Sequence, residues 1–286
     1  MSVLKKIYYC MKNAGEVLKG IVFSMLTLRA GKRERFVEET DKEVLILGNG
    51  PSLNDVDIER IIDGNTDVVC VNFFPIKDQR FFEMKPQYLC LLDPVFFQKS
   101  ATAEDKKAEL FETLEKVDWP MKIICIQGRK LPVNNQNISY SWINGRGFTG
   151  MSLKSFRYFL YRKNLTNCGM QNVVIGALYY FVSKKVRRIY LAGVDMSEFK
   201  QISIGEDNEI YILTQHSYGE EKIKYSDTGI LKKGDLYILL GCYVTMFEQF
   251  RCLQEYAMAQ NVEVLNLSPN SYIDVFEKNA EYLVKK

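Results

Sequence analysis

From residue 41 onward, the chain alternates short apolar runs with longer amphipathic stretches. Several of the apolar runs are continuous, as expected of parallel β-strands that are covered on both faces. The strand candidates cover residues 43–48, 67–72, 87–92, 121–127, 187–192 and 262–266. Helix-like stretches occupy residues 54–62, 103–118, 151–162, 170–185, 244–260 and 271–282. This alternation predicts an α/β fold with a doubly wound, mostly parallel sheet.

Residues 196–235 do not follow this rhythm, because they are polar, contain glycine and are rich in Tyr and Lys. A long irregular insert in a compact domain is usually a functional lid or a disordered loop. We therefore expect one main domain at residues 41–286 that carries a lid at about 196–235.

The first 40 residues form a separate segment. Apolar residues recur there at alternating spacings of three and four, which is a heptad seam: Leu4, Ile7, Met11, Ala14, Leu18, Ile21, Met25 and Leu28. The seam predicts an amphipathic helix at residues 1–40 that contacts the inner surface of a membrane or another subunit of a homo-oligomer. The alternative is a helix that packs against its own domain.

Charge is distributed unevenly along the chain. The net charge is +3, but residues 1–35 contain eight basic and two acidic residues, so the rest of the chain is slightly acidic. A basic segment on a near-neutral body indicates that this segment meets an anionic surface. A nucleic-acid-binding domain would spread basic charge over its fold, so no nucleic-acid partner is expected.

The chain has seven cysteines, an odd number, and no CxxC pair. Cys70, Cys90 and Cys125 lie inside apolar runs, where cysteine behaves as a small buried hydrophobe. This usage favours a reducing compartment. No secretory signal and no apolar segment of about 20 residues is visible. We expect a cytoplasmic protein, with peripheral attachment to the inner membrane as the second expectation.

The first strand candidate ends in the turn Gly48-Asn49-Gly50-Pro51-Ser52. Ligands of open parallel sheets bind outside the carboxyl ends of the strands, and glycine lets a phosphate approach the main chain closely. With the positive end of the next helix at the same place, the turn predicts a phosphate site. It is not a dinucleotide fingerprint, because Leu53 replaces the last glycine. The alternative is a turn that serves chain reversal alone.

Three other strand candidates end in polar residues, namely Asn72, Asp93 and Asp195. Each alone is an ordinary strand terminator. Because the carboxyl ends of parallel strands meet at one edge of a sheet, these side chains are expected to share a crevice with Asn49.

Five stretches in this order resemble the bacterial sialyltransferases of glycosyltransferase family 42, within a wider group that includes the MptE-like pyrophosphokinases. They read VLILGNGPSLNDVD, VCVNFF, LLDPVFF, CGMQNVVIGALYYF running into RRIYLAGVD, and VEVLNLSPNSYIDVF, and they span residues 43–276. The resemblance implies a Rossmann-like, GT-A-like domain with a lid. It also implies an inverting, metal-independent transfer of sialic acid or a related sugar. The implied donor is a CMP-sugar and the acceptor a surface glycan or glycolipid.

The resemblance further implies nucleotide-binding residues. Asn49 matches an asparagine near the donor phosphate, and Asn72 and Asp93 fall on two asparagines that contact the nucleotide. Asp195 matches the aspartate that ends the GxD strand.

The same resemblance places Gly169 at the start of the phosphate-side helix, with Cys168 where the family has serine. Gly48, Gly50 and Ser52 complete the predicted nucleotide site. No cofactor other than the donor substrate is implied.

A proton acceptor is needed for this transfer. His216 is the single histidine of the chain, and a neutral imidazole can take a proton at physiological pH. It lies beside Tyr218, where the family keeps a tyrosine and its catalytic histidine. If Tyr218 matches the family tyrosine, Glu221 falls on the base instead. The two alignments leave His216 and Glu221 as alternative bases.

Two positions depart from the family. Ser197 stands where the family has a tyrosine that bonds the leaving phosphate, and Tyr211, Tyr218 and Lys200 are candidate substitutes. Aspartate in place of asparagine at residue 93 adds negative charge near an anionic donor. The donor is therefore open between CMP-sialic acid, another CMP-sugar and a CDP-linked compound.

Two other functions stay open: an MptE-like pyrophosphokinase that uses ATP and Mg²⁺, and a nucleotide-binding protein that has lost catalysis. Asp55-Val56-Asp57 matches the metal-binding DxD pattern of other glycosyltransferases. It falls in the first turn of the expected helix, however, where acidic residues favour the helix dipole. No metal site is predicted.

Overall fold

The computed structural model describes residues 3–29, 36, 41–99, 103–149, 153–216, 219–229 and 231–284, and of residues 3–10, 214–216 and 220–221 it describes the backbone alone. The helices are α1 (Val3–Arg29), α2 (Phe74–Lys77), α3 (Phe81–Met84), α4 (Glu104–Glu115), α5 (Lys154–Arg162), α6 (Val173–Ser183) and α7 (Leu236–Gln260). The strands are β1 (Glu43–Leu47), β2 (Thr66–Val71), β3 (Tyr88–Leu91), β4 (Met121–Ile126), β5 (Ile138–Ile143), β6 (Arg188–Ala192), β7 (Ile202–Ile204), β8 (Ile210–His216), β9 (Gly219–Lys224), β10 (Glu263–Asn266) and β11 (Glu277–Lys278). Short 3-10 helices are η1 (Pro51–Asp55), η2 (Ile58–Arg60), η3 (Pro94–Phe96), η4 (Glu198–Gln201) and η5 (Tyr225–Thr228).

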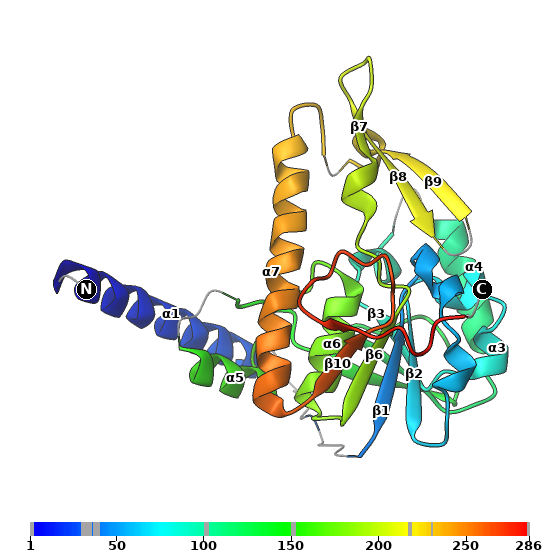
Figure 1. The fold of residues 1–286 in the computed structure, drawn as a ribbon, viewed down its shortest axis with the longest axis horizontal. Helices are drawn as coiled ribbons and strands as arrows, with labels where there is room; N and C mark the ends of the chain where they lie inside the picture. Colours follow the sequence, from blue (N-terminus) through cyan, green and yellow to red (C-terminus); the bar gives the residue numbers. More distant parts are fainter. Residues whose placement is uncertain are drawn as a thin grey trace.

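An eight-stranded sheet forms the centre of the molecule, in the order β11-β10-β6-β1-β2-β3-β4-β5 (Figure 1). Every described pairing in it is parallel. All six predicted strands are present, and the predicted doubly wound α/β fold is confirmed. The chain moves from β1 to β5 in one direction and then returns to β6 on the other side of β1.

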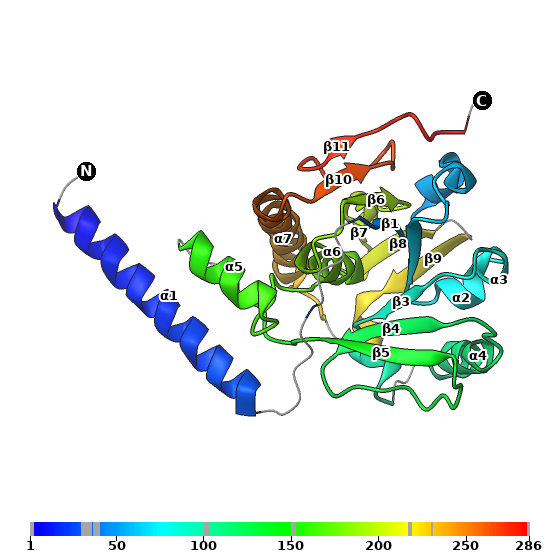
Figure 2. The same ribbon diagram turned by 90° about the horizontal axis from the view of Figure 1, so that it is seen from below.

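Alternate residues of each central strand enter two separate cores. On β1, Val44 and Ile46 pack with α6 and α7, whereas Leu45 and Leu47 face the core that contains residues of α2, α3 and α4. Figure 2 shows these two sets of helices on opposite sides of the sheet. Because both faces are covered, the strands are continuously apolar in sequence.

The predicted helix at 54–62 is wrong. Two short 3-10 helices, η1 and η2, occupy this region, and Val56 between them pairs with Leu283. The Asp57 amide donates to the Tyr282 carbonyl, and the Val284 amide donates to the Asp55 carbonyl. The backbone is therefore partly bonded to the distant C-terminal segment, which a local pattern does not reveal.

The predicted helix at 271–282 is also wrong. This segment is largely extended and includes β11. Ile273 and Phe276 enter the core beside α6 and α7, whereas Tyr282 packs against the opposite core. An extended chain can reach from one face of the sheet to the other around its edge, which a helix of this length would not do.

The other predicted helices are present as α4, α5, α6 and α7. The stretch 244–260 is the second part of α7, which begins at Leu236. The alternating segment ISYSWI forms the edge strand β5, which the search for apolar runs missed because Ser139 and Ser141 interrupt it.

The insert predicted at 196–235 is more regular than expected. It contains a three-stranded antiparallel sheet, β7-β8-β9, which lies beyond the carboxyl ends of the central strands (Figure 1). Ile210 and Leu231 pack with Leu239 of α7 in a small separate core. The insert is thus held against the first turns of α7.

Helix α1 projects sideways from the body and packs against α5 (Figures 1 and 2). Gly20 and Thr27 face the body: Thr27 is buried and accepts a hydrogen bond from the Asn144 side chain at 2.7 Å. The seam residues Leu18 and Met25 lie exposed instead. The alternative of a helix packed against its own domain is therefore confirmed, although the packed side is the one opposite to the seam.

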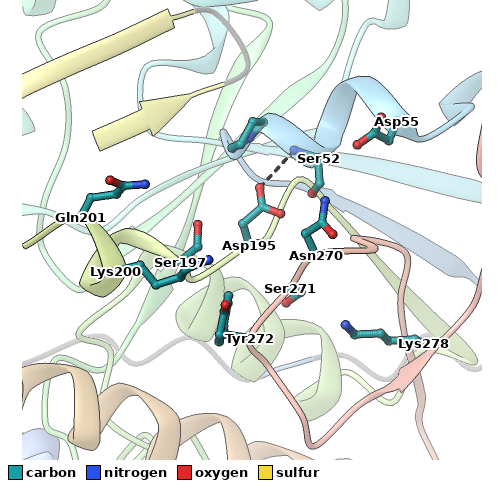
Figure 3. A pocket seen from close by; sticks show the side chains of 11 residues that line it. Ser52, Asp55, Asp195, Ser197, Lys200, Gln201, Asn270, Ser271, Tyr272 and Lys278 are labelled. Carbon is teal, nitrogen blue, oxygen red and sulfur yellow. Dashed lines mark hydrogen bonds between the residues drawn. The ribbon is translucent and has the colours of Figure 1, made fainter. Parts of the chain in front are cut away.

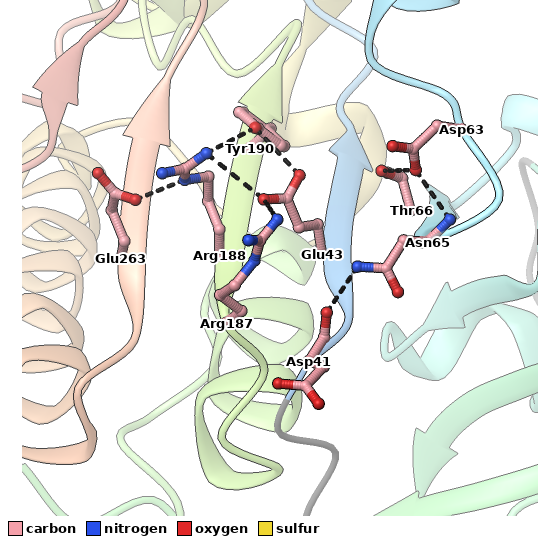
Figure 4. A network of polar contacts seen from close by, with 9 residues as sticks. All are labelled: Asp41, Glu43, Asp63, Asn65, Thr66, Arg187, Arg188, Tyr190 and Glu263. Atoms are coloured by element: carbon pink, nitrogen blue, oxygen red, sulfur yellow. Dashed lines mark hydrogen bonds and ion pairs between the residues drawn. The ribbon is translucent and has the colours of Figure 1, made fainter.

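At the amino end of the sheet, Glu43 ties three strands together (Figure 4). Arg187, Arg188 and Tyr190 all donate to its carboxylate, Tyr190 at 3.1 Å. Arg188 also pairs with Glu263 of β10. Burial raises the pKa of Tyr190 to about 12, so the phenol stays a donor. This network lies at the end opposite to the predicted site and has a structural role.

Among the helices that the structure describes, none has the length and apolar character needed to cross a bilayer.

Candidate functional site

The carboxyl ends of β1 and β6 border a crevice at the point where the chain reverses its direction across the sheet. Ligands of open α/β sheets bind at such switch points. A cavity of about 130 Å³ lies here and is lined by Asn49, Asn72 and Asp195 together with neighbouring backbone. The structure therefore confirms that these three predicted side chains meet at one crevice.

The glycines of the first turn have a packing role. A Cβ on Gly48 would lie 2.3 Å from the Gly193 carbonyl oxygen, and one on Gly50 would lie 2.1 Å from Oδ2 of Asp195. Gly193 itself has φ +69°, and its Cβ would lie 2.8 Å from that of Leu53. The loops after β1 and β6 are thus in direct backbone contact, which only glycine permits.

The predicted phosphate cradle of main-chain amides is not present. The Gly48 amide donates to the Ala192 carbonyl and the Gly50 amide to the Gly193 carbonyl, both at 2.8 Å. The Ser52 amide donates to Asp195 Oδ2 at 3.1 Å. These donors are consumed inside the protein, so the turn is a wall of the crevice rather than an anion-binding loop.

Four side chains at the switch point each contain a buried oxygen without a hydrogen-bond partner among the described residues; three of them line the small cavity, and Ser52 lines the larger cavity described below. They are Asn49 Oδ1, Ser52 Oγ, Asn72 Oδ1 and Asp195 Oδ1. Ser52 and Asp195 are only 3% and 5% exposed. A buried polar atom without a partner costs about 1–3 kcal/mol. Four such atoms around the switch point indicate groups that a ligand satisfies.

A larger cavity of about 560 Å³ continues from Asp195 toward β10 (Figure 3). Its walls are η1, η4 and the segment that joins β10 to β11. Lys200 lies over the Tyr272 ring at 5.2 Å from its centroid, and Lys278 reaches the cavity from the far wall. Sequence reasoning named Lys200 but missed Tyr272 and Lys278, because the C-terminal segment was expected to be helical.

The SPNS motif explains how this wall is held. Ser268 Oγ accepts the Val194 amide at 2.8 Å, and Ser271 Oγ donates to the Val194 carbonyl at 2.7 Å. Both serines are buried. They fix the loop after β6, and with it the neighbouring Asp195.

A third cavity of about 320 Å³ lies on the β2–β3 side and includes Asn72, Asp93, Gln171 and Asn172. Asp93 is exposed and caps η3 by accepting the Val95 amide at 2.8 Å. Asn172 caps α6 by accepting the Val174 amide at 2.8 Å. The helix whose positive end faces the crevice is therefore α6, and not one that follows β1.

Cys168 and Gly169 do not line the described cavities. Cys168 is fully buried in the core beside α6, and burial raises the pKa of its thiol. Gly169 has φ +83°, and a Cβ there would lie 2.3 Å from the Gln249 side chain. Their effect on a ligand would be indirect, through the start of α6. Gln171 and Asn172, which follow in sequence, line the third cavity in their place.

Glu198 is a residue that sequence reasoning did not select. It begins η4, directly after Met196 and Ser197, and lines the small cavity together with Asn49 and Asp195. Burial raises the pKa of its carboxyl, and the Asp195 charge adds to this rise. Catalytic carboxyl groups often lie in a cleft and have a raised pKa.

The predicted catalytic residues lie in the insert. The backbone of His216 ends β8, and Glu221 is in β9, where it pairs with Thr214. The side chains of His216 and Glu221, and Tyr218 altogether, lie outside the described residues. Their catalytic roles stay predictions.

Of the suggested substitutes for the missing tyrosine, Tyr211 is directed elsewhere. It donates to Asp207 at 2.9 Å on the exposed hairpin. Lys200 is the substitute that the structure places at a cavity.

Across the described parts of the chain, no group of three or more His, Cys, Asp or Glu side chains is arranged to hold a metal ion. Within the DxD pattern, Asp55 lines the larger cavity.

No family model matches the chain, and no curated protein matches it significantly. Among solved structures, the chain is similar to the sialyltransferase CstII from Campylobacter jejuni in complex with cytidine-5'-monophosphate, with a TM-score of 0.48, 15% identity and coverage of 87% of this chain and 88% of that one. The chain is also similar to the monofunctional α-2,3-sialyltransferase Cst-I from Campylobacter jejuni, with a TM-score of 0.45 and 15% identity. This match covers 89% of this chain and 88% of that one. A structure of CST-II with a trisaccharide acceptor and CMP gives a TM-score of 0.46 and 16% identity, and the match covers 86% of this chain and 88% of that one. Because these scores and identities are low, the function is inferred from the crevice and the sequence motifs.

Proposed function

We propose that the chain is a glycosyltransferase that moves sialic acid or a related sugar from a CMP-activated donor to a glycan acceptor. The observation that carries this proposal is the convergence of four unpartnered buried oxygens, on Asn49, Ser52, Asn72 and Asp195, at the switch point of the sheet. The family 42 motifs in the sequence supply the identity of the nucleotide.

The chemistry of the crevice supports a nucleoside. A carboxylate oxygen such as Asp195 Oδ1 only accepts hydrogen bonds. The amide of Asn49 is oriented with Nδ2 3.5 Å from the Val71 carbonyl, which leaves its oxygen toward the cavity. Ribose hydroxyls and the cytosine amino group are donors, so they complement these acceptors. A phosphate would not.

The positive groups of the site are placed around this acceptor-rich centre. The positive end of α6 faces one side through Asn172 and Val173, and Lys200 and Lys278 line the other side. We place the donor phosphate against one of these groups, with Lys200 and Tyr272 in the role of the missing tyrosines. A positive group there would stabilise the charge that develops on the departing phosphate.

The reaction is a single displacement with inversion. The acceptor hydroxyl attacks the anomeric carbon, the bond from that carbon to the phosphate oxygen breaks, and CMP leaves with the electron pair. A base receives the proton of the hydroxyl. The candidates are His216 and Glu221 of the insert and Glu198 of the crevice. Within the described part of the chain, no group of three or more His, Cys, Asp or Glu side chains is arranged to hold a metal ion, and we propose a metal-independent transfer.

The test is incubation of the purified chain with CMP-sialic acid in EDTA, with CMP release followed by chromatography. We expect slow release of CMP by hydrolysis in the absence of an acceptor and faster release when a glycan acceptor is added. NMR of the product should show an inverted anomeric configuration. If CMP-sugars and CDP-sugars all stay intact, the transferase proposal fails.

Two further measurements, on ATP turnover and on stabilisation by nucleotides, distinguish the transferase from the two other functions. An MptE-like pyrophosphokinase would release AMP from ATP with Mg²⁺ and would be stabilised against heat by ATP and not by CMP. A binding protein without catalysis would be stabilised by CMP but leave every donor intact.

A further inference from the structure

Helix α1 presents an apolar face that no described part of the molecule covers. Its exposed members lie on one side of the helix: Met11, Leu18, Ile21, Val22, Met25, Leu26 and Leu28. Met11, Leu18 and Met25, one heptad apart, are 71%, 62% and 60% exposed. These residues, called here the outer face of α1, include the seam residues Met11, Leu18, Ile21, Met25 and Leu28.

The body of the protein uses the opposite side of the helix. A Cβ on Gly20 would lie 3.1 Å from Leu160 and Phe156 of the α5 region, and Thr27 is fully buried. Val17 and Phe23 pack with Phe148 and Leu160 in the same small core. Because this contact already anchors the helix, the outer face is not needed for packing within the chain.

Charge along α1 limits what can cover the outer face. The helix contains five basic residues and one acidic residue, Glu16. At 100° per residue, Lys12 and Lys19 fall on one flank of the outer face together with Glu16, and the helix as a whole has four more basic than acidic residues. A helix with a net positive charge and a broad apolar face matches one that lies on an anionic lipid surface, with its apolar groups below the headgroups and its basic groups among the phosphates.

A second copy of the chain fits less well. Subunit pairing through a heptad seam usually depends on complementary charges at the positions that flank the seam. The described flanking residues Gly15, Val17, Val22 and Ser24 are uncharged, and Arg29 has no acidic counterpart among them.

We propose that the outer face of α1 binds the surface of an anionic lipid bilayer, with the helix lying in the plane of that surface. The surface is separate from the crevice, so this proposal does not depend on the donor.

The experiment is flotation of the full chain with two kinds of vesicle, one of pure phosphatidylcholine and one with 30% phosphatidylserine. We expect binding to the anionic vesicles that is at least about tenfold stronger than to the neutral ones. It should weaken when NaCl rises from 50 to 500 mM, because salt screens the lysines. Equal binding to both vesicles, or binding to neither, overturns the proposal.

Variants locate the surface. Leu18→Ser with Met25→Ser should reduce binding at least about tenfold through lost apolar burial. Lys12→Gln should reduce it about fivefold. The matched control is Leu240→Ser with Val244→Ser on α7, which are also exposed apolar residues and should leave binding unchanged. Unaltered thermal unfolding of each variant shows that the fold is intact, as expected for exposed positions.

Light scattering in the absence of lipid gives the competing outcome. We expect the same mass for the wild type and for the Leu18→Ser, Met25→Ser variant. An oligomer that the double substitution converts to a monomer, without vesicle binding by the wild type, would assign the outer face to a subunit interface and overturn the lipid proposal.

Discussion

The carboxylate of Asp195 accepts the backbone N–H of Ser52 across the boundary between β6 and β1, with Oδ2 3.1 Å from the nitrogen. One oxygen of Asp195 thus joins the two loops of the switch point, and the other has no partner among the described residues. The same side chain therefore builds the crevice and is available to a ligand in it. This double role links the stability of the turn to nucleotide binding.

Gly50→Ala should destabilise the protein. The new methyl group would lie 2.1 Å from Asp195 Oδ2 and 2.7 Å from the Gly193 carbonyl oxygen, and overpacking of this kind costs about 1–3 kcal/mol. Urea unfolding measures the loss. Gly64→Ala is the control, since a Cβ there meets nothing within 4 Å. Equal stability of the two variants would contradict the close contact of the loops.

Asn72→Gly should weaken nucleotide binding and leave stability nearly unchanged. Asn72 has φ +53°, a conformation that glycine also adopts readily, so the variant removes the amide without backbone strain. Loss of one hydrogen bond to the nucleotide is worth about 1 kcal/mol, or about a fivefold rise in the Kd for CMP, measured by calorimetry. Asn261→Gly, at φ +58° at the end of α7, is the matched control. An unchanged Kd in Asn72→Gly would remove Asn72 from the site.

Glu198→Gln should alter the pH dependence of stability. Because burial raises the pKa of Glu198 in the folded state, its contribution to stability is present at a pH below its ordinary pKa and is lost as pH rises through the raised value. The variant should therefore be more stable than the wild type at pH 7 and close to it at pH 4. Urea unfolding at both pH values checks this, with the exposed Glu112→Gln as the control. A variant that is less stable at pH 7 would contradict the burial of this charge.

The same variant tests Glu198 as a base. A carboxyl accepts the proton only when ionised, so the rate of wild-type transfer should fall as pH drops through the raised pKa. Glu198→Gln should lower the rate by about 10²- to 10⁴-fold. If the variant keeps its rate and His216→Ala or Glu221→Gln loses it, the base lies in the insert.

Lys200→Gln should slow transfer about 10- to 100-fold if its ammonium stabilises the leaving phosphate. CMP release from CMP-sialic acid at saturating donor measures this. Lys130→Gln is a matched control, because Lys130 lies over the Tyr140 ring at 5.6 Å just as Lys200 lies over Tyr272. The same rate in both variants would exclude Lys200 from the chemistry.

Glu43→Gln should cost stability without affecting the ligand. Glu43 is buried and accepts hydrogen bonds from Arg187, Arg188 and Tyr190. Weakening charged hydrogen bonds of this kind costs about 1–3 kcal/mol, measurable by urea unfolding. The Kd for CMP should be that of the wild type, since this network lies at the other end of the strands.

Local patterns were sufficient for six of the eight strands of the central sheet, all except β5 and β11. A strand such as β1 is buried on both faces, so its apolar run identified it, and the polar residue that follows each strand had to lie at the common carboxyl edge. Asn49, Asn72 and Asp195 could be placed together for this reason. The same reasoning misjudged residues 54–62 and 271–282, whose backbone hydrogen bonds are made to distant segments.

Long-range contacts decided which backbone and side-chain groups at the carboxyl edge of the sheet are available to a ligand. The turn Gly48-Asn49-Gly50 suits a phosphate when considered alone, but the Gly48 and Gly50 amides are bonded to the carbonyls of Ala192 and Gly193, at the distant end of β6. Tyr272 and Lys278 reached the cavity because the C-terminal segment wraps over the edge of the sheet. On α1, the heptad seam was readable from spacing alone. Which side of the helix faces the body was not, because that depends on how closely Gly20 and Thr27 can approach α5. The periodicity of apolar residues reflects burial averaged along one helix or strand. The partner of each buried group depends instead on how elements that are far apart in the chain pack together.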